Sequence, residues 1–214
     1  MNWQDEGFIL SKLKYNENSI IINVFTKNHG KRSAIVYGGN SSKQRNFLQV
    51  GNKIFVVYKS KNDSKIGYFS SELKEPITPF FFDDEKKITC ILSALSILKI
   101  VLPENQVYKE IYDSLEKLLK NIKKNDWIFS YIFWEQYLIK RLGYEITFQD
   151  DIININGKNL EFPKFLKTKN VENVNNQEIS LALNFNKNLL LDNFMDENIN
   201  KIPLNRNLLE GYFH

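Results

Sequence analysis

The chain has 214 residues, of which 43% are hydrophobic, 14% aromatic and 25% charged, with a formal net charge of +4. This composition is typical of one large or two small globular domains and excludes an intrinsically disordered chain. No apolar run is long enough to span a membrane, and the acidic start MNWQDEGFIL does not resemble an export signal. A single cysteine, Cys90, excludes an internal disulfide and predicts a reducing compartment, most simply the cytoplasm.

The first third of the chain predicts five short strands. Runs rich in Ile, Val, Phe and Tyr alternate with turn sequences such as YNEN, KNHG and SKNDS. Five strands with one long loop, GGNSSKQRN, between the third and the fourth fit a small barrel such as the OB-fold. An SH3-like barrel is the competing architecture. The predicted strands are residues 7–14, 19–26, 32–38, 52–59 and 65–74.

The segment EPITPFFFDDE ends the strand pattern, because its two prolines oppose both a helix and an interior strand. We therefore predict an α+β protein with a five-stranded OB-fold barrel at 1–78 and a mainly α-helical domain at 79–214. Asp83 and Asp84 are suited to cap the first helix. DIININGKNLEF predicts a short hairpin. Apolar residues at helical spacing predict helices at residues 88–102, 107–122, 126–142, 177–195 and 205–213.

Positive charge is concentrated in the predicted barrel. Residues 1–80 contain 12 Lys/Arg and 6 Asp/Glu, whereas residues 81–214 contain 17 and 19. From residue 18 to residue 62 there are eight Lys/Arg and no acidic residue. A surface that only keeps a protein in solution mixes both signs, so this acid-free segment predicts contact with a nucleic acid. The cations that we expect at the interface are Lys27, Lys31, Arg32, Lys43, Arg45 and Lys53.

The glycine-rich sequence GGNSSKQR does not match a nucleotide-binding loop. A P-loop has the pattern GxxxxGK[ST] between a strand and a helix, whereas here no glycine directly precedes the lysine and a strand pattern follows. Gly38, Gly39 and Asn40 are more simply explained as a turn that permits positive φ.

Residues for acid–base or metal chemistry are scarce. The only histidines are His29, in a predicted turn, and His214, the last residue, and no Cys/His spacing resembles a zinc site. Metal-assisted nuclease chemistry needs several converging acids, which the basic segment lacks. We therefore predict a protein that is not an enzyme and that uses no metal and no cofactor.

Aromatic residues lie among the cations of the acid-free segment. Tyr37, Phe47 and Tyr58 are candidates to stack on unpaired bases. The alternative for each of them is burial in the barrel core, and the sequence alone leaves both open.

Several irregular motifs occur together in a fixed order. The barrel segment contains WQDEGFILS, then YNENSIIINVFTKNHGK, then VYGGNSSKQRNFLQVGN. The helical segment contains FWEQYLIKRLGY and, as a looser match, IPLNRNLLEGYF. In these motifs the chain resembles RecO, a family of bacterial recombination mediators. Between residues 143 and 201 the resemblance is limited to the order of the elements.

The resemblance implies an OB-fold followed by a helical domain, in a protein without enzymatic activity. It implies binding to single- and double-stranded DNA and annealing of complementary strands. It also implies that the protein, with its partner RecR, helps to load the recombinase RecA onto DNA coated by single-stranded-DNA-binding protein. Lys31, Arg32, Lys43 and Arg45 match the basic turn and loop of the family. A cytoplasmic, nucleoid-associated location follows from this role.

The resemblance also implies a peptide site in the helical domain. The acidic, phenylalanine-ending tail of single-stranded-DNA-binding protein would dock there, in an apolar pocket with a basic rim. Lys140 and Arg141 are the rim residues that we expect, while Ile132 and Phe133 stand where some members have arginine. Many members have a four-cysteine zinc site after the LGY motif. GYEITFQDDIININGKN contains no cysteine, so we expect packing to replace the metal.

The main hypothesis is therefore a DNA-binding, strand-annealing mediator. The alternative is an adaptor whose basic barrel binds acidic protein tails or RNA. A nuclease or nucleotidyl enzyme is a third candidate, disfavoured by the missing acids, histidines and metal ligands. Salt dependence distinguishes the first two, because binding through many phosphates weakens steeply as salt rises. No contact with a membrane is expected.

Overall fold

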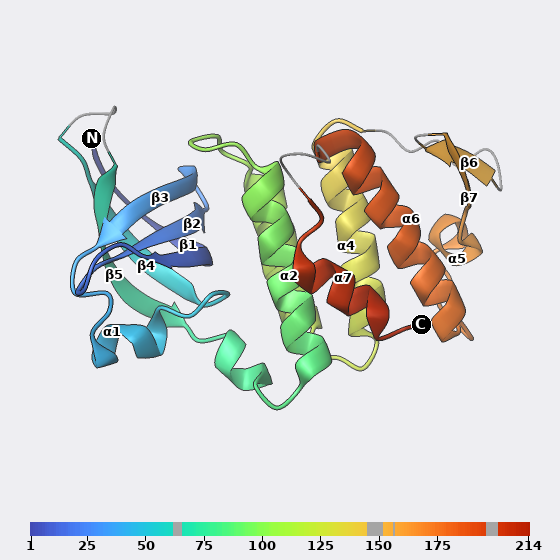
Figure 1. The fold of residues 1–214 in the computed structure, drawn as a ribbon, viewed down its shortest axis with the longest axis horizontal. Helices are drawn as coiled ribbons and strands as arrows, with labels where there is room; N and C mark the ends of the chain where they lie inside the picture. Colours follow the sequence, from blue (N-terminus) through green and yellow to red (C-terminus); the bar gives the residue numbers. More distant parts are fainter. Residues whose placement is uncertain (62–65, 145–151, 156, 196–200) are drawn as a thin grey trace. The chain divides into compact units, whose positions relative to one another are not determined.

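A computed structural model describes the chain except for residues 62–65, 145–151, 156 and 196–200 (Figure 1). The chain divides into two compact units, residues 1–113 and 114–214, and each is described by itself.

The first unit contains a closed barrel with the strand order β1-β2-β3-β5-β4. All pairings are antiparallel except that of β3 with β5, which is parallel. This topology confirms the predicted five-stranded OB-fold rather than an SH3-like barrel. The strands are β1 (Asn2–Lys14), β2 (Ile20–Thr26), β3 (Gly30–Val36), β4 (Lys53–Lys59) and β5 (Gly67–Glu75).

The barrel closes because β1 is long enough to pair with two strands. Residues 2–8 pair with β4, and residues 7–14 pair with β2, with a register shift between Ile9 and Ser11. The sequence prediction began this strand at residue 7, because Trp3, Asp5 and Glu6 do not follow the apolar pattern of a strand core. The five additional residues are the ones that complete the barrel.

A short helix, α1 (Ser42–Phe47), follows β3 and lies at the barrel end opposite the N-terminus (Figure 1). We predicted a loop here, since the segment has no apolar helical period. The helix is stabilised locally instead: the Ser41 side chain accepts a hydrogen bond from the backbone N–H of Gln44. Leu48, directly after the helix, is fully buried and packs in the barrel core. The core residues of the barrel are Ile9, Ile20, Ile22, Val24, Ala34, Val36, Leu48, Ile54, Val56, Tyr58 and Phe69.

The segment after the barrel packs onto the outside of the barrel. A 3-10 turn, η1 (Thr78–Phe81), leads into α2 (Glu85–Val101), which contacts β1. Of the two predicted capping residues, Asp84 is the N-cap and accepts from the N–H of Lys87, whereas Asp83 lies before the helix. At the start of α3 (Lys109–Asn121), the Tyr112 ring packs on Phe8 and Phe25 of the barrel, with centroid distances of 5.2 and 5.6 Å.

The second unit is built mainly from helices, and it begins at residue 114, whereas the predicted helical domain begins at residue 79. Its elements after α3 are α4 (Trp127–Arg141), the hairpin β6 (Ile152–Ile155) and β7 (Lys158–Glu161), α5 (Lys164–Thr168), α6 (Asn176–Phe194) and α7 (Leu204–Gly211). Helix α6 packs against α4 and α7 (Figure 1). The short helix α5 was not predicted, because its five residues are too few to show a helical period.

The hairpin region contains no cysteine, so its residues do not fit a four-cysteine zinc site. Aromatic packing holds this region against the helices. Phe162 contacts Phe185 of α6 edge-to-face at 5.1 Å between centroids. Phe165 of α5 contacts Phe129 and Phe133 of α4 at 5.8 and 6.2 Å. Such pairs add to the free energy of burying the rings themselves.

A buried ion pair connects three helices of this unit. Arg206 of α7 donates two hydrogen bonds to Glu135 of α4, at 2.6 and 3.1 Å, and both side chains are fully buried. Arg206 also donates to the carbonyl oxygen of Leu183 in α6 and lies 3.4 Å from Glu210. Burial would lower the pKa of Arg206, but the charge of Glu135, with Tyr131 and Glu210, raises it, so the guanidinium stays charged.

The Arg206→Ala substitution is expected to lower the free energy of unfolding by about 3–5 kcal/mol, because it leaves the Glu135 carboxylate buried without its cation. Urea unfolding of the full chain, followed by circular dichroism, measures this loss. The matched control is Lys120→Ala, which removes the exposed partner of Glu116 and is expected to cost about 1 kcal/mol or less. Equal losses in the two variants would contradict a special role of the buried pair.

Candidate nucleic-acid interface

Two of the six predicted contact residues, Lys31 and Lys53, are buried, and their charged groups contact other residues of the first unit. The Lys31 ammonium donates to the carbonyl oxygen of Lys99 at 2.6 Å. Burial lowers the pKa of Lys31, opposed by attraction to Glu104. Lys53 pairs with Glu6 at 2.9 Å and lies over the Tyr112 ring. Both side chains point to the outer barrel face that residues 99–112 cover.

Lys27 and Arg32 make contacts within the protein, and both side chains remain partly exposed. Lys27 forms an ion pair of 3.6 Å with Asp113, and both side chains are substantially exposed. Arg32 donates to the Tyr58 hydroxyl at 3.1 Å, packs over the same ring, and hydrogen-bonds the Asn105 side chain. Both cations lie at the barrel end that contains the β2–β3 turn.

Lys43 and Arg45 are exposed on α1, at the other barrel end. Lys12 of β1 joins them, since its ammonium donates to the Leu48 carbonyl and the Gln49 side chain at 3.2 and 3.3 Å. Burial lowers the pKa of Lys12, and repulsion from Arg45 lowers it further. Among the described residues, none of these three cations forms an ion pair with a carboxylate. We call Lys12, Lys43 and Arg45 the α1 cations.

Lys12 was missed by the sequence analysis because it precedes the acid-free segment. Its proximity to α1 depends on a contact across 36 residues, for which the local sequence contains no signal.

The end of α1 is tied to the connection that leaves the barrel. The Asn52 side-chain oxygen accepts from the N–H groups of Ile77 and Thr78 at 2.8 and 3.3 Å, and its nitrogen donates to the Phe47 carbonyl at 3.0 Å. Gly51 has φ of +94°, and a Cβ at this position would lie 2.5 Å from the Thr78 hydroxyl. The LQ-x-G-N sequence therefore has a structural role: it fixes the position of helix α1, which contains Lys43 and Arg45.

The three aromatic candidates have different surroundings. Tyr58 is buried in the barrel core, and Phe47 is half-buried against it. Tyr37 is 65% exposed, and its ring centroid lies 6.0 Å from that of the exposed Tyr68 on β5. Of the three, only Tyr37 presents most of its ring to solvent.

A second group of aromatic rings lies at the barrel end near the β2–β3 turn. His29 stacks on Trp3 with centroids 4.1 Å apart and planes within 5°, and Trp3 stacks on Tyr58 at 4.9 Å. The buried Asp5 carboxylate accepts from the His29 ring at 2.9 Å and from the backbone and side chain of Asn28. We call His29, Trp3 and Tyr58 the ring column.

Burial disfavours the charged form of Asp5, but the hydrogen bond with His29 and those from Asn28 and Glu6 outweigh it. Together they lower the pKa of Asp5 below its ordinary value. Asp5 is therefore ionised at neutral pH and can only accept hydrogen bonds, which makes His29 Nδ1 the donor.

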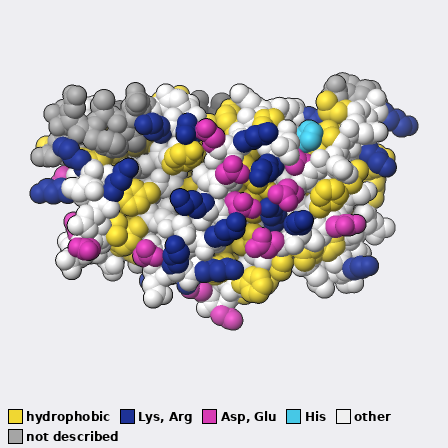
Figure 2. Space-filling view, turned by 180° about the vertical axis from the view of Figure 1, so that it is seen from behind, with side chains coloured by type: hydrophobic (Ala, Val, Ile, Leu, Met, Phe, Trp, Pro, Cys, Tyr) yellow, Lys and Arg dark blue, Asp and Glu magenta, His cyan; other side chains and the backbone are white. Residues whose placement is uncertain are grey.

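Cations and acids alternate on the molecular face that Figure 2 displays, so this face has no large area of a single sign. Lys31 and Lys53 are buried, so counting basic residues along the chain overestimates the cationic surface. The α1 cations stand out because, among the described residues, none of them forms an ion pair with a carboxylate.

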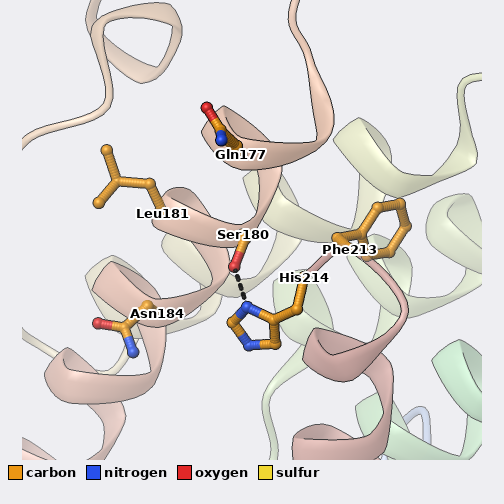
Figure 3. A pocket seen from close by; sticks show the side chains of 6 residues that line it. All are labelled: Gln177, Ser180, Leu181, Asn184, Phe213 and His214. Carbon is orange, nitrogen blue, oxygen red and sulfur yellow. Dashed lines mark hydrogen bonds between the residues drawn. The ribbon is translucent and has the colours of Figure 1, made fainter.

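The two predicted rim residues lie in the last turn of α4. Lys140 and Arg141 are both exposed, and Arg141 packs over the Tyr137 ring at 5.1 Å. A separate open pocket of about 460 Å³ lies between α6 and the C-terminal residues (Figure 3). Neither rim residue lines it. The lining residues are Gln177, Ser180, Leu181, Asn184, Phe213 and His214.

The described residues also bear on metal-binding and membrane-spanning proteins. They contain no group of three or more His, Cys, Asp or Glu residues placed to hold a metal ion. In the same residues, no helix combines the length and hydropathy that crossing a bilayer requires.

Fold and site together define a protein of the OB-barrel class with a helical C-terminal region. Residues 1–77 match the family model of the Recombination protein O N terminal, and residues 83–207 match that of the Recombination protein O C terminal. The chain belongs to the RecO family. The boundary predicted after residue 78 lies between the two matched segments and stays a proposal.

Relatives with the same family name cover most of the chain. "DNA repair protein RecO" of Wolbachia sp. subsp. Drosophila simulans is 33% identical over 76% of this chain and 68% of its own length. The protein of the same name from Ehrlichia chaffeensis is 31% identical over 76% of this chain and 66% of its own length. That from Roseobacter denitrificans is 28% identical over 74% and 69%.

The lowered pKa of Asp5 predicts how the stability of the barrel depends on pH. Because the folded-state pKa lies below the unfolded value of about 3.9, the stabilisation is complete above that pH and is lost as the pH falls through the folded-state pKa. Urea unfolding of the wild type and of Asp5→Asn between about pH 2 and pH 6 tests this. The variant is expected to lose less stability on acidification, and parallel curves would contradict the prediction.

Proposed function

We propose that this protein is a recombination mediator in DNA repair. It binds single- and double-stranded DNA through its OB barrel and anneals complementary strands. Together with RecR, it helps to load RecA onto DNA coated by single-stranded-DNA-binding protein, and it acts at the nucleoid. The protein performs no catalysis of its own and uses no metal or cofactor. Membership in the RecO family and the α1 cations support this proposal.

The observation that favours DNA binding most directly is the clustering of the α1 cations: Lys43 and Arg45 are exposed on one short helix, and Lys12 donates to the Leu48 carbonyl at its end. Two like charges held near each other raise the free energy of the unliganded protein, and a phosphate placed between them removes that cost. Exposed Lys and Arg side chains also release counterions from a nucleic-acid backbone, which gives affinity without sequence preference. Such sites suit a protein that acts on DNA of any sequence.

Annealing follows from the same electrostatics. Two complementary strands repel each other through their phosphates, and cations at the barrel surface reduce this repulsion while the strands pair. The exposed α1 cations are available for this role, and Lys27 and Arg32 contribute where their side chains are exposed. Lys31 and Lys53 do not contact DNA directly. They contribute by holding residues 99–112 against the outer face of the barrel.

The helical domain is proposed to recruit partners. The acidic, phenylalanine-ending tail of single-stranded-DNA-binding protein docks at the end of α4, where Lys140 and Arg141 are exposed next to the Tyr137 ring. A cationic rim beside an aromatic surface matches an acidic peptide with a terminal aromatic residue.

Replacing two α1 cations is expected to weaken DNA binding and to reduce its salt dependence. Fluorescence anisotropy of labelled single-stranded DNA over a salt series compares the wild type with Lys43→Ala/Arg45→Ala. The slope of log K against log salt should fall by about 1.4, since each phosphate contact to a single strand contributes about 0.7. The rate of annealing of complementary oligonucleotides should fall in the same variant.

The matched control is Lys117→Ala/Lys120→Ala, which removes two exposed cations from α3. It is expected to leave the slope unchanged. An equal loss in both variants would mean that net charge alone determines binding. If the wild type does not bind DNA at low salt, the mediator proposal is wrong, and the adaptor for acidic tails or RNA becomes the better explanation.

Removing the two rim cations is expected to weaken peptide docking about threefold to tenfold, because rim charges steer encounter more than they fix the complex. Isothermal titration of a synthetic acidic peptide that ends in phenylalanine compares the wild type with Lys140→Ala/Arg141→Ala. The control Lys164→Ala/Lys167→Ala removes two exposed cations from α5. Unchanged affinity in the rim variant would place the peptide elsewhere.

A further inference from the structure

We propose that His29 is a stacking platform for an unpaired base of single-stranded DNA, at the barrel end opposite α1. This inference deepens the proposed function, because it rests on DNA binding by the barrel. It assigns a base contact to a residue that the sequence pattern places only in a turn, and it predicts how the barrel distinguishes single strands from duplex DNA.

The first argument is the geometry of the ring column. One face of His29 lies flat on Trp3, and Trp3 in turn lies on Tyr58, which is only 1% exposed. Phe69 meets Trp3 and Tyr58 edge-on at 5.9 and 5.5 Å. The column is thus anchored in the barrel core, and His29 is its outer member.

The second argument is the part of the His29 ring that remains exposed to solvent. The His29 side chain is 35% exposed. Because Trp3 covers one face and Nδ1 is bonded to Asp5, the exposed part consists of the opposite ring face and the outer edge. A flat aromatic ring with one free face matches a nucleobase, since every base has a π-face and histidine is among the side chains on which unpaired bases stack.

The third argument is rigidity. His29 Nδ1 donates to Asp5, and Asp5 is itself held by hydrogen bonds from the N–H groups of Glu6 and Asn28 and from the Asn28 side chain. The backbone N–H of His29 donates to the Thr26 hydroxyl at 3.2 Å. Ring and backbone are therefore fixed before any ligand binds, which lowers the entropic cost of stacking.

Charge near the column favours a phosphate backbone. Lys27 lies two residues before His29 and is partly exposed, and Arg32 lies on the Tyr58 ring at the same barrel end. A strand whose base stacks on His29 therefore has cations within reach for its phosphates. Bases inside a duplex are already stacked on both faces, so the platform can contribute only to binding of unpaired DNA.

Two substitutions separate the ring from its hydrogen bond. His29→Asn places an amide nitrogen where Nδ1 lies, so it keeps a donor for Asp5 and removes the ring. His29→Tyr keeps an aromatic face and removes the Nδ1 donor to Asp5. Thermal unfolding of each variant verifies that the barrel remains folded.

Fluorescence anisotropy measures binding of oligo-dT and of a duplex whose two ends are closed by non-nucleotide linkers, so that it contains no unpaired base. Replacing His29 by Asn is expected to weaken binding of the single strand about fivefold or more, the low end of what base–aromatic stacking contributes, and to change duplex binding less than about twofold. The tyrosine variant should restore most of the affinity. An oligonucleotide containing 2-aminopurine should lose fluorescence on binding to the wild type and the tyrosine variant, but less with the asparagine variant.

Single-strand affinity and 2-aminopurine quenching unchanged in His29→Asn would overturn the stacking proposal while leaving DNA binding by the α1 cations intact. An equal loss for single strand and duplex would also overturn it, because that pattern reports a general contact with phosphate. If the wild type binds neither ligand, the proposed function itself fails. The two failures are thus distinguishable.

Discussion

Barrel closure by β1 is the constraint on which the rest of the first unit depends. One strand pairs with β2 along one part and with β4 along another, so the sheet has no free edge there. The strand bends between its partners, and the register shift between Ile9 and Ser11 marks a bulge of the kind that bends strands. Closure then decides, residue by residue, which side chains enter the core and which face outward.

The outward faces of the strands are not equivalent, because residues 99–112 cover part of the barrel. On the covered face, Phe8 and Phe25 meet Tyr112, and Lys31 donates to the backbone of α2. A lysine on this face satisfies its charge within the protein, whereas a lysine on α1 stays in solvent. The acid-free segment thus predicts how many cations the barrel has, but not which of them a ligand can reach.

The local sequence predicted most elements of this fold, since each strand and long helix has its own apolar period. The sequence-based prediction failed for elements that are stabilised by a cap or by contacts with distant residues rather than by an apolar period. Helix α1 depends on a cap at Ser41 and on Leu48 entering the core, and the first residues of β1 depend on pairing with β4. The pair between Glu135 and Arg206 joins residues 71 positions apart, and no local pattern indicates such a contact.

The residues of the candidate site also fall into two groups, those that the local sequence predicts and those that it does not. Lys43 and Arg45 were predicted because charge is visible in the sequence, whereas Lys12 and the ring column were not. Trp3, His29 and Tyr58 come from three different strands or turns, and only the register of the closed barrel brings their rings together.

The two barrel ends suit two different components of a nucleic acid. The seven-residue strand β2 runs from the barrel end near α1 to the turn that contains His29. In the proposed function, cations at the first end act on phosphates, which single strands and duplexes share. A ring at the second end acts on bases, which only a single strand offers. A protein that anneals strands must hold unpaired DNA and then release the paired product. Two separate contact sites allow both steps. When the strands pair, the contact between His29 and a base is lost and the contacts with phosphates remain. The affinity for DNA therefore falls when the duplex forms, without any change in the barrel.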